Sequence, residues 1–177
     1  SMKIGKTKLD VVAGDIAAMD TGAIVTPAND MLWTGSGVSA RIHHEGGPSI
    51  ETEALAKAPA QIGNAIATKA GGLKARHVIH AVISGQDLTT DEEKVRAAVR
   101  SSLVKADELR CGSLAMPLLD SASFDVEVHV AARIIVDETV NYLLGTKSSL
   151  ERVVFVEHED NLRGLFDTAL REKFTRR

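Results

Sequence analysis

Apolar residues along this chain occur in two alternating patterns. One is a short continuous run rich in Val, Ile and Ala, ended by Gly, Pro or Asp, which is typical of a buried strand. The other is a longer series with apolar residues every three or four positions, which is typical of a helix that packs one face on a core. The runs predict strands at 9–13, 23–26, 63–68, 77–82, 113–116 and 152–156. The helix-spaced series predict helices at 38–45, 50–58, 91–110, 128–143 and 162–170.

The alternation of strands with helices favours an α/β fold. We expect a three-layer α/β/α sandwich around a mixed, mostly parallel sheet of about six strands. The first two strands are joined by a short connection, so they could pair with each other. No repeat, low-complexity tract or Pro/Ser linker interrupts the pattern, and we predict one domain over residues 2–177.

The stretch 23–47 combines a strand, a polar turn, a glycine loop and a helix start. It reads AIVTPANDMLWTGSGVSARIHHEGG. Because Pro27 lacks an amide hydrogen, we predict that the strand ends there. Gly35 and Gly37 let the backbone approach a ligand closely, and free amides at the start of the helix point at negative charge. The stretch therefore suits an anion, although a flexible connection with glycines for turning is the alternative.

Several other polar residues also follow predicted strands. Asp15 follows the first strand, where a carboxylate can accept a hydrogen bond from an amino group of a ligand or cap the next turn. A second small-residue loop, 120–125, lies between a strand and a helix, and His158 follows the last strand. Ligands bind at the carboxyl ends of strands in such sheets. These residues could therefore converge with Asn29 on one cleft.

Composition and charge exclude several classes of protein. The chain has 177 residues, of which 44% are hydrophobic, and its net charge of −3 argues against a general nucleic-acid binder. Cys111 is the one cysteine, so no internal disulfide can form. No apolar run is long enough to span a membrane. We expect a cytoplasmic protein, a monomer, with no membrane partner.

Motifs for other chemistries are weak. No loop has the pattern G-x-x-x-x-G-K-[ST] of a nucleoside triphosphatase. Gly35-x-Gly37-x-x-Ala40 matches the dinucleotide fingerprint, but too many residues separate its glycines from the strand. His43 and His44 are unsuitable as a metal pair, because adjacent side chains on a helix point about 100° apart. We interpret His77 and His80 as residues of the core or strand edge, and we expect no metal and no cofactor.

The order of these motifs resembles the macro domain family, whose members bind ADP-ribose. The resemblance rests on Gly14-Asp15-Ile16, Ala23-Ile24-Val25, Pro27-Ala28-Asn29, Gly35-Ser36-Gly37-Val38, Ile42-His43, Gly63-Asn64-Ala65, Gly72-Leu73, Val78-Ile79-His80-Ala81, Met116-Pro117 and Phe124. It spans nearly the whole chain.

The resemblance implies a role for each candidate residue. Asp15 would accept a hydrogen bond from the adenine amino group, and Ile16 would pack beside the adenine. Asn29 would face the distal ribose, and His158 would lie over the adenine. The diphosphate would be wrapped by two loops, which are Gly35, Ser36, Gly37 and Val38 in the first and Ser121, Ala122, Ser123 and Phe124 in the second, with Phe124 against the distal ribose.

The sequence also departs from the family. Many relatives read Asn-Ala-Ala-Asn where this chain has residues 26–29, and Asp120 and Asp125 flank the second loop, where they would repel a diphosphate unless they point away. Relatives that hydrolyse ADP-ribosyl groups often carry an aspartate at the position of Ser39, and serine is no unassisted base near neutral pH.

Four hypotheses follow from these residues. The first is a module that binds ADP-ribose, free or attached to protein. The second is a hydrolase that removes ADP-ribose from proteins, nucleic acid or related metabolites, with Asn29 as the residue that positions a water. Because Ser39 is no carboxylate, we predict that such hydrolysis is absent or slow. The others are a dinucleotide-dependent oxidoreductase and an α/β scaffold with a degenerate pocket.

Overall fold

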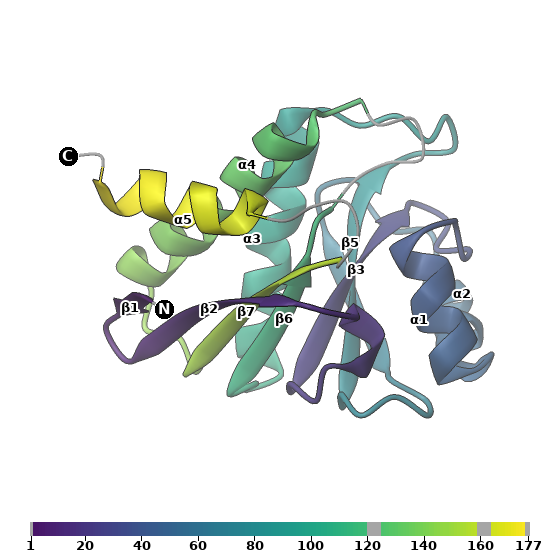
Figure 1. Ribbon diagram of the computed structural model, residues 1–177. Coiled ribbons are helices and arrows are strands. Elements are labelled where there is room, and N and C mark those ends of the chain that lie inside the picture. The colour runs from purple at the N-terminus through teal and green to yellow at the C-terminus, as the bar shows by residue number, and fades with distance from the viewer. Residues whose placement is uncertain (1, 120–124, 159–163, 176–177) are drawn as a thin grey trace.

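The computed structural model describes residues 2–119, 125–158 and 164–175. Within them the chain forms a seven-stranded sheet with helices on both faces (Figure 1). The strands are β1 (Met2–Ile4), β2 (Thr7–Ala13), β3 (Ala23–Asn29), β4 (Ala65–Lys69), β5 (His77–Ser84), β6 (Ser113–Pro117) and β7 (Arg152–Glu157). The helices are η1 (Ile16–Ala18, a 3-10 turn), α1 (Val38–Gly46), α2 (Ser49–Ala56), α3 (Glu92–Glu108), α4 (Val128–Gly145) and α5 (Leu165–Thr175).

The predicted α/β/α sandwich is confirmed. In Figure 1, α1 and α2 lie on one side of the sheet, and α3, α4 and α5 lie on the other. The sheet has seven strands rather than about six, because β1 is too short to produce a pattern in the sequence. It is mixed and mostly parallel, since β2, β7, β6, β3 and β5 run parallel while β1 and β4 pair antiparallel at the two edges.

The first two long strands, which could have paired, do not. The strand order is β1-β2-β7-β6-β3-β5-β4, so two strands separate β2 from β3. Both edges of β2 are occupied by β1 and β7. The short connection instead passes through η1, whose Ile16 and Ala17 pack with Ile24 on the face of the sheet that α1 covers.

The prediction that a strand ends at Pro27 is wrong. β3 continues through Pro27 to Asn29, and Pro27 lies opposite Ala81 of β5. The described pairing of β3 with β6 covers only Ala23 and Ile24. Beyond Ile24 one edge of β3 is thus outside that ladder, and a residue without an amide hydrogen is tolerated at such a position. The extension carries Asn29 to the very end of the strand.

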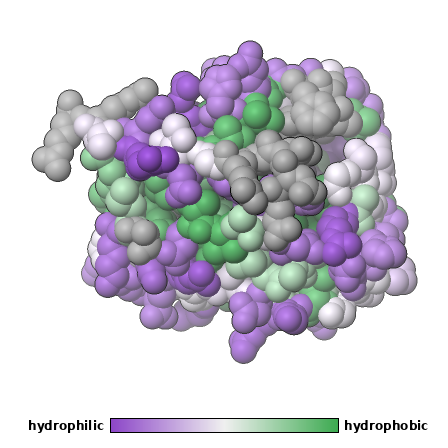
Figure 2. All heavy atoms as spheres, viewed as in Figure 1, coloured by the Kyte–Doolittle hydropathy of each residue, from purple (hydrophilic) through white to green (hydrophobic). Residues whose placement is uncertain are grey.

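Each face of the sheet has its own apolar core. The larger cluster lies under α3, α4 and α5 and includes Leu103, Ile135 and Phe166. A smaller one under α1 and α2 includes Ile42 and Ile50. On the face of the molecule in Figure 2, hydrophobic residues gather toward the middle and hydrophilic residues surround them. No helix in the described part of the chain is both long and apolar enough to span a bilayer.

The parallel strands fix where a site can form. β2, β7, β6, β3 and β5 all end at the same edge of the sheet, since they run in one direction. Three strand spacings of about 4.8 Å separate β2 from β3, or roughly 14 Å along that edge. Segments that follow these two strands can therefore hold opposite ends of an elongated ligand.

Candidate functional site

The sequence-predicted residues lie at the carboxyl-end edge of the sheet. Asp15 and Ile16 follow β2, Asn29 ends β3, and His158 follows β7. Residues 35–38 lead from β3 into α1. Ser121, Ala122, Ser123 and Phe124 lie outside the described residues. The Gly14 amide donates to the Glu157 carbonyl at 2.8 Å, which ties the turn that carries Asp15 to the end of β7 beside His158.

Asp15 has two sets of partners. Its Oδ1 accepts a hydrogen bond from the Ala17 amide at 3.0 Å, so it caps η1 as one of the two interpretations predicts. Its Oδ2 accepts from Nε and Nη2 of Arg41 at 3.0 and 2.5 Å. The hydrogen bond from Arg41 holds the pKa of Asp15 below its ordinary value, and the charge that His158 can carry acts in the same direction. Asp15 is therefore an ionised acceptor near neutral pH.

Arg41 connects the Asp15 turn to α1. It lies one helical turn after Gly37, and its Nη1 also pairs with Glu45 at 3.0 Å. The pairing with Asp15 raises the pKa of Arg41, so the guanidinium stays charged. Sequence reasoning missed this residue, because the spacing along α1 shows which face Arg41 is on but not that η1 packs there.

The glycine loop ends in an open helix start. Gly37 is the N-cap of α1 with φ +63° and ψ −128°, a conformation that favours glycine. No side chain caps this end, so the first amides of α1 keep their capacity to meet an anion. A Cβ added at Gly35 or Gly37 would have no neighbour within 4 Å, which leaves space in front of the loop.

Asn29 organises the loop that follows β3. Its Oδ1 accepts from the Met31 amide at 3.1 Å and from Nε2 of Gln86 at 3.3 Å. Its Nδ2 donates to the Trp33 carbonyl at 3.0 Å. An amide nitrogen carries two hydrogens, so one remains for a further acceptor among the described contacts. The side chain is buried, and its three hydrogen bonds fix its orientation.

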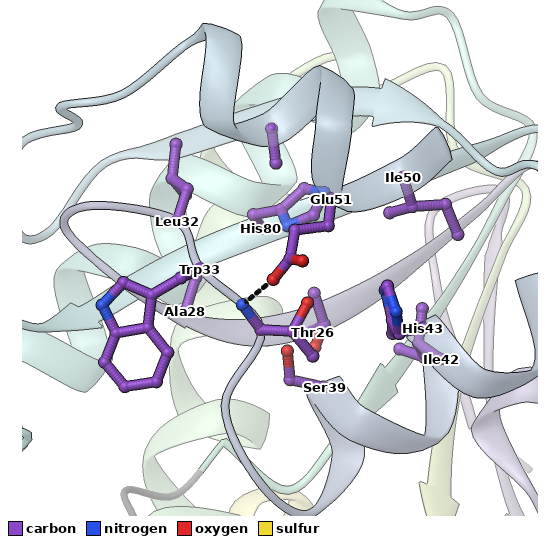
Figure 3. Close-up of a pocket in the computed structure, with 12 residues that line it drawn as sticks. Thr26, Ala28, Leu32, Trp33, Ser39, Ile42, His43, Ile50, Glu51 and His80 are labelled. Carbon is purple, nitrogen blue, oxygen red and sulfur yellow. Dashed lines mark hydrogen bonds between the residues drawn. The ribbon is translucent and has the colours of Figure 1, made fainter. Parts of the chain in front are cut away.

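A small pocket lies beneath the same loop, between α1 and α2 (Figure 3). Its cavity volume is about 20 Å³, room for about one water molecule. Polar and charged side chains line it, and these are Thr26, Thr34, Ser39, His43, Glu51 and His80. Ser39 and Glu51 thus face one space.

Glu51 of α2 anchors the loop that follows β3. The Thr34 amide donates to its Oε2, as the dashed line in Figure 3 shows. Hydrogen bonding by Thr34 lowers the pKa of Glu51, so the carboxylate is ionised at neutral pH. Sequence reasoning gave Glu51 no place in the site. An acidic residue in the first turn of α2 suits the positive end of that helix, and its reach toward Thr34 depends on how α2 packs.

His80 belongs to the core, as predicted. It shares a hydrogen bond of 2.9 Å with the Thr68 hydroxyl across β4 and β5. Burial lowers the pKa of His80 to about 4, so its ring is neutral under physiological conditions. Among the residues that the structure describes, no group of three His, Cys, Asp or Glu side chains is placed to hold a metal ion.

Asp125, one of the two acids that flank the second loop, makes a contact away from that loop. Its Oδ2 accepts a hydrogen bond from the Thr90 amide at 2.9 Å, just before α3. This carboxylate therefore contacts the backbone just before the start of α3. Asp120 lies outside the described residues.

Comparison with known sequences identifies the family of this chain. The family model described as Macro domain matches residues 25–135. A macro domain-containing protein of Streptomyces coelicolor is 35% identical over 178 residues, covering 97% of this chain and 98% of that protein. A protein of Mycobacterium tuberculosis is 35% identical over 94% of this chain. The chain spans only 46% of the length of that mycobacterial relative.

Solved structures agree with this family. A macrodomain of Oceanobacillus iheyensis with ADP bound has a TM-score of 0.86 and 25% identity, covering 98% of this chain and 95% of that one. Its D40A mutant has a TM-score of 0.87 and 25% identity, covering 98% and 96%. A Trypanosoma brucei macrodomain in complex with ADP-ribose, at 24% identity, has a TM-score of 0.82 and covers 92% of this chain and 68% of that one. At 24% identity, the comparison with the Trypanosoma brucei macrodomain shows a shared fold and no more.

Proposed function

Because this chain belongs to the macro domain family, we propose that it binds ADP-ribose, free or linked to protein. The ligand lies along the carboxyl-end edge of the sheet. The observation that carries the proposal is the open start of α1 at Gly37, next to an ionised carboxylate at one end of the edge and a buried amide at the other. The similar macrodomain with bound ADP supports a ligand of the same class.

At the adenine end, Asp15 is the acceptor for the amino group. A carboxylate offers about four lone-pair positions, and the Ala17 amide and two Arg41 nitrogens use three of them. One position is left for an amino hydrogen of the base. Arg41 fixes the orientation of the carboxylate. Ile16 and His158 flank this end.

In the middle, the diphosphate meets backbone amides rather than lysines. Residues 35–38 supply the amides at the start of α1, and the absent Cβ at Gly37 keeps the approach open. The segment 121–124 is the proposed second wall. At the far end, the remaining Nδ2 hydrogen of Asn29 donates to a hydroxyl of the distal ribose.

Calorimetry with ADP-ribose, AMP and NAD tests the proposal. We expect ADP-ribose to bind most tightly, because only it combines a base and a diphosphate with a distal ribose whose anomeric hydroxyl is free. AMP lacks the second half, and the nicotinamide of NAD occupies the position next to the distal ribose. If ADP-ribose produced no heat and no thermal shift, the proposal would be contradicted.

Hydrolysis of ADP-ribosyl groups is the second candidate, and Glu51 favours it. The start of α1 has no carboxylate, because residue 39 is a serine. Glu51, however, lines the same pocket as Ser39. A carboxylate there could orient or activate a water near the distal ribose, with Asn29 positioning it. The Thr34 amide already binds Glu51 and lowers its pKa, which makes it a weak base. We therefore expect a slow reaction.

Three proteins decide between the two candidates. The wild type, Ser39→Asp and Glu51→Gln are incubated with mono-ADP-ribosylated protein, and released ADP-ribose is measured. We expect slow release by the wild type, a gain in Ser39→Asp, and a loss in Glu51→Gln toward the 10²–10⁴-fold typical of a missing base. Brisk release by the wild type would make the chain a hydrolase, and Asn29→Ala should then abolish activity. Binding by all three without release would make it a reader.

A further inference from the structure

Two large apolar side chains lie on the surface directly after Asn29. Met31 is 41% exposed and Trp33 is 37% exposed, and Trp33 is the one tryptophan of the chain. Isolated exposed apolar residues are common, but here the two are close neighbours on one short loop. In Figure 3 the indole of Trp33 extends away from the side of the pocket that holds His43 and Ile50. Trp33 thus lines one side of this pocket and is also partly exposed, beside the proposed position of the distal ribose.

The indole is fixed in place rather than loosely exposed. Its Nε1 donates to Oε1 of Gln86 at 2.9 Å. Nε2 of Gln86 in turn donates to Asp30 at 2.6 Å and to Asn29 at 3.3 Å. The carbonyl of Trp33 accepts from Asn29. Both the ring and the backbone of Trp33 are already held. When a partner contacts Trp33, this side chain therefore loses little conformational entropy.

Acidic residues border this surface. Asp30 contacts Gln86 directly, and Asp87 follows Gln86 in the chain. The Thr89 amide lowers the pKa of Asp87, so it is ionised at neutral pH. Glu51 adds a further carboxylate under Thr34. Such a rim repels the phosphates of a nucleic acid and attracts cationic side chains, which can also stack on the face of an indole.

We propose that Met31, Trp33 and the carboxylates of Asp30 and Asp87 form a docking surface for the polypeptide that carries the ADP-ribose. The surface favours a peptide with Lys or Arg next to the modified residue. This inference rests on the proposed function, because a protein is attached through the distal ribose, and Asn29, the residue proposed to hold that sugar, is bonded to Trp33. A reader of this design recognises the protein segment as well as the nucleotide.

The test compares three ligands on the wild type and Trp33→Ala. The ligands are free ADP-ribose, a mono-ADP-ribosylated peptide with flanking Lys and Arg, and the same peptide with flanking Glu. In Trp33→Ala the backbone carbonyl that Asn29 uses remains. We expect its affinity for the basic peptide to fall about 5–30-fold, as for an interface side chain that contributes to binding, with the affinity for free ADP-ribose changed less than about 2-fold.

Two further variants complete the test, one as a control and one as a probe of charge. Leu144→Ala removes an apolar side chain that is 71% exposed at the end of α4, and it should leave all three affinities unchanged. Asp30→Asn keeps an oxygen for Gln86 but removes the charge, so the preference for the basic over the acidic peptide should shrink. Melting temperatures show that each variant is folded.

The possible results separate the two proposals. A wild type that binds none of the ligands contradicts the ADP-ribose proposal and this inference with it. A wild type that binds free ADP-ribose, with a Trp33→Ala variant that loses no peptide affinity, overturns this inference alone. An equal loss for peptide and free ADP-ribose also overturns it, because Trp33 would then belong to the sugar pocket. An ADP-ribosylated oligonucleotide is added as a fourth ligand, and tighter binding of it than of the basic peptide also overturns the inference.

Discussion

The two ends of the proposed cleft are built differently. At the base end, Asp15 is charged and its acceptor positions are mostly used by Ala17 and Arg41. At the ribose end, Asn29 is neutral and buried, and it shapes its own loop through Met31 and Trp33 while one hydrogen stays unused. The base end is held by an ion pair across η1 and α1, and the ribose end by hydrogen bonds within a single loop and to Gln86.

The difference bears on what each end can contribute to binding. In the proposed complex, an incoming amino group would share Asp15 with Arg41, so the base end would select by the one open acceptor position. The ribose end is preorganised, because Asn29 is oriented before the ligand arrives. Variants at the shared middle should have the largest effects, variants of Asp15 smaller ones, and variants of Arg41, which acts through Asp15, the smallest.

Gly37→Glu should have the largest effect, because it places a charged side chain where both halves of the ligand meet. We expect the affinity for ADP-ribose to fall at least ~100-fold through steric filling and charge repulsion, in a protein that still folds. Titration calorimetry measures the loss. Gly47→Glu is the matched control, since Gly47 also has positive φ and open space but lies at the other end of α1. Similar losses in both variants would point to damage to α1 itself.

Asp15→Ala should weaken ADP-ribose binding by about 1.5–3 kcal/mol, the range for a hydrogen bond to a charged group. The variant also removes the η1 cap, so Asp15→Asn provides a comparison that retains an acceptor for the Ala17 amide. Competition with AMP shows whether the loss lies at the base end, because AMP should be affected as strongly as ADP-ribose. An affinity unchanged in both variants would leave Asp15 as a cap only.

Arg41→Ala should have the smallest effect on the affinity for ADP-ribose near neutral pH. Its effect should appear mainly at acid pH. Arg41 lowers the pKa of Asp15, so in the wild type the carboxylate stays ionised below the ordinary pKa of an aspartate. Binding that depends on this carboxylate is lost as pH falls through its pKa. Without Arg41 that pKa rises, and the loss should begin at a higher pH. Affinities measured across the acid range, with circular dichroism to confirm folding, check the shift, and superimposable profiles would refute it.

The local patterns of this sequence determine the elements. Alternating apolar runs and helix-spaced series locate most strands and helices, and Asp91 is the N-cap of α3, where an acid before a helical series is expected. The glycines before Val38 fix the start of α1. These features depend on residues a few positions apart, so backbone sterics and side-chain spacing suffice to predict them.

Tertiary structure alone decides which elements become neighbours. β2 pairs with β7, more than a hundred residues later in the chain, and Pro27 lies within a strand because β6 leaves β3 after Ile24. The same holds for the two contacts that give the site its charges, Arg41 with Asp15 and Glu51 with Thr34. Each depends on the rotation and packing of a helix against a distant segment. That packing is a balance of long-range burial over the whole core, which no local pattern of residues encodes.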